Sequence, residues 1–152
     1  MGLKLEGFAP FLLDPVELEV APGEIVFLTG PSGSGKSLFL RALADLDVHQ
    51  GAAWLDSTGM EDVAAPSWRR RIGYLTAESC WWSERVGDHF TRPDREQAVE
   101  LGLPGEVFDW RVSRLSSGEK QRLALLRLLQ QEPRALLLDE RLAAPTFLGS
   151  ST

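Results

Sequence analysis

The sequence has few of the residues that would mark a disulfide-rich, membrane-spanning or nucleic-acid-binding protein. Its one cysteine, Cys80, cannot form an internal disulfide, and we expect it to be a packed thiol. Its longest apolar runs fall well below the roughly 20 residues that a membrane-spanning helix needs. Lys and Arg number 16 against 22 Asp and Glu, a net charge of −6. That balance argues against a nucleic-acid partner, and the basic cluster at 69–71 is predicted to be solvated.

What the sequence does contain fits a single α/β domain. It has 152 residues, of which 43% are hydrophobic and 25% charged, as in an ordinary globular protein. Alternating apolar residues predict half-buried strands at 3–5 and 16–20. The apolar run Ile25–Leu28 predicts a strand buried on both faces of a parallel sheet, followed by a glycine-rich loop and a helix. The remaining predicted elements are short strands at 53–55, 72–75 and 135–138 and one long helix at 116–131.

The segment 77–111 differs from the rest of the chain. Its aromatic residues are set among prolines and glycines, and one stretch has helical periodicity, which predicts a small, mostly helical insert. The two histidines, His49 and His89, have polar neighbours, so we expect both on the surface.

The glycine-rich loop carries the strongest chemical signal. It fits the phosphate-binding pattern in full and lies between a predicted strand and a predicted helix, as that pattern requires. Its glycines allow backbone N–H groups to surround phosphates, Lys36 supplies a positive charge, and Ser37 supplies a hydroxyl for Mg²⁺. The predicted nucleotide-binding residues of this loop are Gly30, Pro31, Ser32, Gly33, Ser34, Gly35, Lys36 and Ser37.

Two other motifs follow further along the chain. The apolar strand at 135–138 ends in two acids, and a strand end holds a carboxylate rigidly. Asp139 is therefore a candidate for the Mg²⁺ shell and Glu140 for polarising an attacking water, unless both acids simply face water at a strand end. The third motif is a Ser/Gly loop that runs directly into the long helix. Ser116 and Gly118 would present a hydroxyl and N–H groups to an anion there, although such a start is more often only a helix cap.

Together these motifs resemble those of the ATP-binding cassette (ABC) ATPase family, with a Walker A loop at 30–37, a signature loop at 115–119 and Walker B at 136–140. Guanylate-type kinases have a similar first loop but not the signature stretch. The resemblance covers nearly the whole chain and implies a P-loop NTPase (RecA-like) core with N-terminal strands. The aromatic-rich insert looks like the family's helical subdomain, which faces a transmembrane permease subunit. Trp81 and Trp82 would then either contact that permease or be buried in the subdomain.

The resemblance also implies how the site works. Two nucleotide domains pair head to tail, as a homodimer or heterodimer, and Ser116 and Gly118 of one domain serve the γ-phosphate of ATP held by the other. The adenine ring stacks on an aromatic residue upstream of Walker A, for which this chain offers Phe11 and Phe8. The implied activity is hydrolysis of MgATP coupled to transport. The implied location is cytoplasmic, on the inner face of the membrane through the permease partner.

The chain departs from the family pattern in several places. Ala77 stands where the family has a glutamine that contacts Mg²⁺ and the attacking water, so either Glu78, one place later, substitutes for it with a shifted register or this contact is absent. Ser117 replaces a glycine of the signature. After Glu140 neither the dimer-contact loop nor the strand with the switch histidine is recognisable. We therefore expect an incomplete domain that lacks the C-terminal part of its core and is marginally stable, because two apolar strands lose a shared neighbour. A truncated, catalytically impaired nucleotide-binding remnant is the alternative function.

Overall fold

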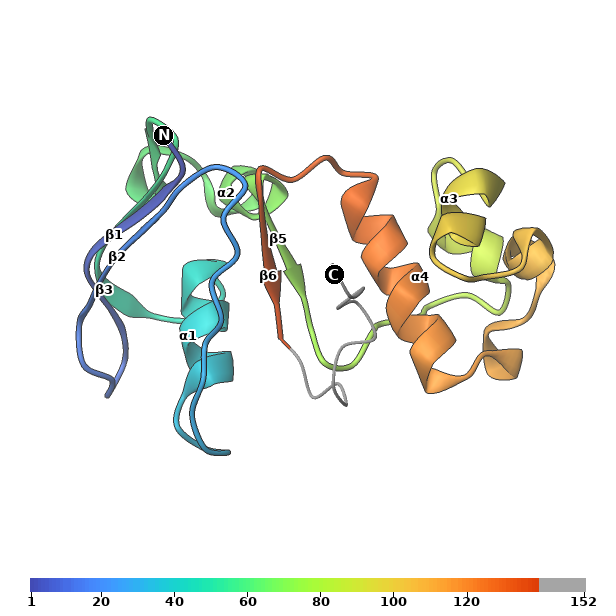
Figure 1. Ribbon diagram of the computed structural model, residues 1–152, viewed down its shortest axis with the longest axis horizontal. Helices are drawn as coiled ribbons and strands as arrows, with labels where there is room; N and C mark the ends of the chain where they lie inside the picture. The colour runs from blue at the N-terminus through green and yellow to red at the C-terminus, as the bar shows by residue number, and fades with distance from the viewer. Residues whose placement is uncertain (140–152) are drawn as a thin grey trace, which may run out of the picture.

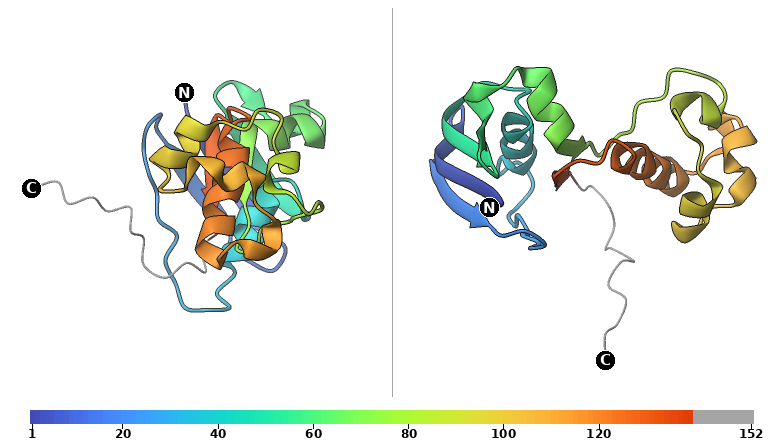
Figure 2. Two further views of the ribbon diagram at one scale, coloured as in Figure 1. Left: turned by 90° about the vertical axis from the view of Figure 1, so that its right-hand side faces the viewer. Right: turned by 90° about the horizontal axis from the view of Figure 1, so that it is seen from above.

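The computed structural model describes residues 1–139, which form two lobes on either side of a short parallel sheet (Figure 1; Figure 2, right). Alternating apolar residues produce the strands of the first lobe, and helical periodicity produces the long helix of the second. The elements, in chain order, are β1 (Leu3–Pro10), β2 (Val16–Val20), α1 (Lys36–Leu43), β3 (His49–Leu55), β4 (Thr58–Gly59), η1 (Met60–Asp62), α2 (Ala65–Arg71), β5 (Ile72–Leu75), η2 (Val86–His89), α3 (Arg95–Glu100), η3 (Gly105–Asp109), η4 (Val112–Arg114), α4 (Ser117–Leu129) and β6 (Ala135–Leu138).

The first lobe is built on an antiparallel sheet in the order β2-β1-β3-β4. Leu5 of β1 lies between Leu18 of β2 and Ala53 of β3, so apolar side chains gather on the face that packs against α1. Phe8 and Trp68 are fully buried in the same core. These strands confirm the sequence predictions at 3–5, 16–20 and 53–55.

The two lobes are joined by β5 and β6, the strands that the sequence predicts at 72–75 and 135–138, and these two strands pair in parallel. The register sets Tyr74 beside Leu137, and the ladder continues one residue further, where the Asp139 N–H donates to the Leu75 carbonyl at 2.9 Å. Because side chains alternate along a strand, Tyr74, Leu137 and Asp139 share one face of this sheet. That face is the one turned toward the core of the first lobe, where Leu137 is buried.

The second lobe is a cluster of short helices packed on one face of α4. Its core joins residues of the insert to three residues at the start and middle of the α4 segment: Val86, Phe90, Ala98, Leu103, Val107, Phe108, Leu115, Leu123 and Leu126. The buried Gln121 side chain donates to the Thr76 carbonyl at 3.0 Å, which ties α4 to the end of β5. The predicted helix at 116–131 is confirmed, with both ends slightly further in.

The predicted buried strand at Ile25–Leu28 is wrong. This segment has no regular secondary structure, and its four side chains are 42–78% exposed. A strand forms only where neighbouring strands take up its N–H and C=O groups, and within residues 1–139 no strand pairs with this segment. The strand at 135–138 exists, but Leu136 and Leu138 are 41% and 45% exposed rather than buried, for the same physical reason.

Both histidines and the cysteine also differ from expectation. His89 is buried, and its Nε2 accepts hydrogen bonds from the N–H groups of Trp82 and Ser83, so satisfied polar groups offset its desolvation. The His49 side chain is only 8% exposed and packs against Phe8. Cys80, expected to be packed, is exposed.

Candidate functional site

The glycine-rich loop leads into α1 through a residue that must be glycine. Gly35 is the N-cap of α1 and has a left-handed backbone with φ +96°, which strains any side chain. A Cβ at this position would lie 2.7 Å from a methyl carbon of Leu13, so the Leu13 side chain, in the segment before β2, packs closely against the loop at Gly35. The N–H groups of the first helical turn have no partner within the helix and therefore face any anion placed at its start.

Lys36 folds back over the loop that precedes it. Its ammonium group donates to the carbonyls of Gly30 and Pro31, the latter at 3.0 Å, and lies 3.5 Å from the Ser34 hydroxyl. The tip of the loop, at 31–34, is exposed to solvent. A positive charge held beside exposed N–H groups is the arrangement that binds the phosphates of a nucleotide.

The acid predicted for the metal site lies at this loop. The Ser37 hydroxyl donates to Asp139 Oδ1 at 3.1 Å, although the two residues are 102 positions apart in the sequence. Mg²⁺ takes oxygen ligands and is usually held by one or two side chains, with phosphate oxygens and water completing its shell. The donor set suits Mg²⁺, because the Ser37 hydroxyl and the Asp139 carboxylate are both oxygen ligands. Within residues 1–139 there is no cluster of three or more His, Cys, Asp or Glu residues. Glu140 lies outside the described residues.

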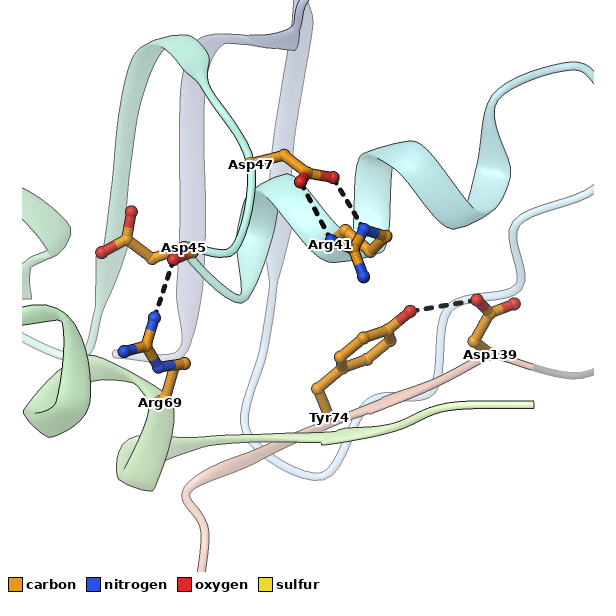
Figure 3. A network of polar contacts seen from close by, with 6 residues as sticks. All are labelled: Arg41, Asp45, Asp47, Arg69, Tyr74 and Asp139. Atoms are coloured by element: carbon orange, nitrogen blue, oxygen red, sulfur yellow. Dashed lines mark hydrogen bonds and ion pairs between the residues drawn. The ribbon is translucent and has the colours of Figure 1, made fainter. Parts of the chain in front are cut away.

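The structure adds one residue that sequence reasoning missed. Tyr74, on β5, donates its hydroxyl to Asp139 Oδ2 at 3.1 Å (Figure 3). Burial, reinforced by this bond and the charge of Asp139, raises the pKa of Tyr74 to about 12, so the phenol is protonated and acts as the donor. Its position could have been found by pairing the strands predicted at 72–75 and 135–138 in parallel, since the register sets Tyr74 beside Leu137, which lies two residues before Asp139 on the same face.

The signature residues form a helix cap in the other lobe. The Ser116 hydroxyl accepts from the Glu119 N–H at 3.1 Å, and the Glu119 carboxylate accepts from the Ser116 N–H at 2.8 Å. These bonds lower the pKa of Glu119. Ser116, Ser117 and Gly118 are all exposed, and α4 lies across β5 and β6 from α1 (Figure 1). The structure therefore brings together the residues of Walker A and Asp139 but not those of the signature loop.

The two phenylalanines expected to stack on the adenine ring have different environments. Phe8 is fully buried and packs edge-on against Phe39 in the first lobe, so its ring is closed to a ligand. Phe11 is 69% exposed and lies two residues before Leu13, which touches the loop at Gly35. Ala77, at the place of the family glutamine, is half-buried, and Glu78, one residue later, is exposed.

A glycine-rich loop that opens a helix, with its serine bonded to an aspartate at the end of a parallel strand, defines a P-loop nucleotide-binding domain. The chain belongs to the ABC transporter family, whose model, described as "ABC transporter", matches residues 13–143. An aliphatic sulfonates import ATP-binding protein, SsuB 2 of Rhizobium johnstonii, is 40% identical over 88% of this chain and 53% of its own length. An Fe(3+) ions import ATP-binding protein, FbpC of Streptomyces avermitilis, is 38% identical over 86% of this chain and 42% of its own.

Solved structures show the same fold. A bacterial Atm1-family ABC exporter with ATP bound superposes with a TM-score of 0.75 and 26% identity, covering 91% of this chain and 29% of the exporter. CbiO1 of Clostridium perfringens, part of the ABC transporter complex cbiONQ, superposes with a TM-score of 0.75 at 21% identity, covering 91% of this chain and 64% of its own. The chain spans about half the length of the curated relatives it matches.

Proposed function

We propose that this chain binds and hydrolyses MgATP as the ATP-binding subunit of an ABC transporter. The observation that carries the proposal is the 3.1 Å contact between the Ser37 hydroxyl and Asp139, which assembles a P-loop and an acid from opposite ends of the chain. The relatives described above are both named as import ATP-binding proteins, which supports an importer. They do not favour the alternative of a remnant without catalysis.

The loop residues have separate roles in this proposal. The phosphates of ATP lie against the N–H groups of the loop, and Lys36 exchanges its bonds to the Gly30 and Pro31 carbonyls for bonds to phosphate oxygens. Ser37 and Asp139 would hold Mg²⁺, which supplies charge neutralisation at the phosphates. Glu140, directly after Asp139, is proposed to orient and deprotonate the attacking water.

The exposed signature loop supports a head-to-tail pair of nucleotide domains. Ser116 and Gly118 lie in the lobe away from Walker A, and a side chain added at Gly118 would meet nothing within 4 Å. They are therefore open to the γ-phosphate of a nucleotide bound by a second domain, where the start of α4 would attract it.

The second lobe is proposed to contact the permease through Trp82. The Trp82 side chain is 67% exposed, whereas Trp81 is half-buried and bonded to Ser79. The Arg127 guanidinium lies about equally close to both indole rings, at 5.0 and 4.9 Å, and steadies them. Within residues 1–139 no helix has both the length and the apolar character to cross a membrane. Attachment to the inner face of the membrane would then come through the permease.

Nucleotide binding by the full 152-residue chain tests the proposal. A fluorescent ATP analogue should bind with Mg²⁺, and Lys36→Ala should abolish binding because it removes the charge beside the loop. Lys4→Ala is the matched control, since Lys4 lies on β1 in contact with Glu6 and away from the loop. Equal binding by the Lys36→Ala and unchanged chains would refute the site. Steady-state hydrolysis that Glu140→Gln removes would refute the remnant alternative.

A further inference from the structure

The Asp139 carboxylate is held at both of its oxygens. Ser37 donates to Oδ1 from the start of α1, and Tyr74 donates to Oδ2 from β5, each at 3.1 Å (Figure 3). The Ser37 contact belongs to the P-loop itself. The Tyr74 contact comes from a separate element, and the proposed function gives it no role.

The orientation of Tyr74 follows from the parallel sheet. Ile72 and Tyr74 point to the same face of β5, and Ile72 is fully buried against the core of the first lobe, with Tyr74 packed at its edge. Packing therefore fixes the Tyr74 ring, and its hydroxyl reaches Asp139, the residue that directly follows β6. Buried or half-buried tyrosines place the hydroxyl on a hydrogen-bond partner, and here that partner is the candidate metal ligand.

The nearby cation does not compete for this carboxylate. Arg41 of α1 lies close to Tyr74 in Figure 3, but its guanidinium is bonded to Asp47, through Nε at 2.8 Å and Nη2 at 3.0 Å. With Arg41 engaged elsewhere, Tyr74 and Ser37 set the direction of the Asp139 side chain. A bond at Oδ2 leaves Oδ1 turned toward Ser37, where the two proposed Mg²⁺ ligands meet.

We infer that Tyr74 is a positioning residue for the metal site: its hydroxyl holds Asp139 in the orientation that binds a divalent cation beside Ser37. This inference rests on the proposed function. Outer-shell partners of this kind affect metal affinity because a ligand that is free to rotate must be ordered when the metal binds.

The test measures metal affinity separately from nucleotide affinity. Mn²⁺ binding to the full chain, saturated with a non-hydrolysable ATP analogue, is followed by electron paramagnetic resonance. Tyr74→Phe removes only the hydroxyl and should weaken Mn²⁺ binding about tenfold. Affinity for the analogue in EDTA should not change. Thr76→Val is the matched control, because it removes a hydroxyl that is bonded to the Glu78 carbonyl rather than to Asp139, and should leave both affinities unchanged.

A double-substitution cycle shows whether Tyr74 acts through Asp139. In an Asp139→Asn background, which keeps one oxygen ligand, the Tyr74→Phe change should alter Mn²⁺ affinity less than twofold, since the two effects share one contact. The inference is overturned if Tyr74→Phe leaves Mn²⁺ affinity unchanged, or if it weakens binding of the ATP analogue in EDTA as much as it weakens binding of Mn²⁺. Additive effects of the two substitutions in the cycle would also overturn it. Failure of the unchanged chain to bind the nucleotide would instead refute the proposed function.

Discussion

Substitutions of Phe11 and Phe8, the two phenylalanines that precede the glycine-rich loop, should have opposite effects. Phe11 is 69% exposed and lies two residues before Leu13, whose side chain is at the loop, whereas Phe8 is fully buried. Stacking of a base on an aromatic ring contributes about 1–3 kcal/mol. At about 1.4 kcal/mol per tenfold in affinity, Phe11→Ala should weaken ATP binding by about 5- to 150-fold. An exposed side chain makes few packing contacts, so the free energy of unfolding should change by less than about 0.5 kcal/mol.

Phe8→Ala should show the reverse pattern, a large change in the free energy of unfolding and little change in ATP affinity. It removes a ring that contacts Phe39 and His49 in the core, which should lower the free energy of unfolding by about 3–5 kcal/mol. Urea unfolding and titration of a fluorescent ATP analogue measure the two quantities. Phe11→Trp should retain affinity, and Leu12→Ala is the matched control, because Leu12 is an exposed apolar neighbour with no ring to stack. ATP affinity in Phe11→Ala equal to that of the unchanged chain would refute base stacking at this position.

Other substitutions test the contacts around the site. Trp68→Phe removes the buried bond from Nε1 to the Leu43 carbonyl, 2.8 Å long, and should lower the free energy of unfolding in urea by about 1–3 kcal/mol. Ser116→Ala removes the cap of α4 and should cost about 1 kcal/mol in the same assay. Tyr74 is the chain's single tyrosine, so tyrosinate absorbance should report its pKa of about 12, and Asp139→Asn should lower it. Because that pKa is raised in the folded state, stability should fall as the pH rises from about 10 to about 12.

The features that were predictable from sequence are those set by local chemistry. The loop, the helix that begins at Lys36 and the cap at Ser116 depend on residues a few positions apart, so their patterns are visible in one segment. The contact between Ser37 and Asp139 follows from two separate motifs, because the loop pattern and the acid-ending strand each predicted an oxygen ligand for Mg²⁺. The burial of His89 was not predictable, because its two donors, at positions 82 and 83, reach it only after the insert folds. The predicted strand at 25–28 failed because a strand depends on neighbours that its own sequence does not specify.

The order of the P-loop depends on the same groups that would bind the ligand. On the side that precedes it, Ile25–Leu28 has no strand partner among the described residues, so that flank contributes no ladder of hydrogen bonds. The loop is instead held by the helix α1, by the bonds from Lys36 to its carbonyls and by the bond from Ser37 to Asp139. A ligand that binds only the folded loop adds stability by mass action, about 2.7 kcal/mol at a concentration 100 times its dissociation constant. A change at Ser37 should therefore remove a metal ligand and loosen the loop together, whereas a change at Tyr74 leaves the bonds from Lys36 to the loop carbonyls in place.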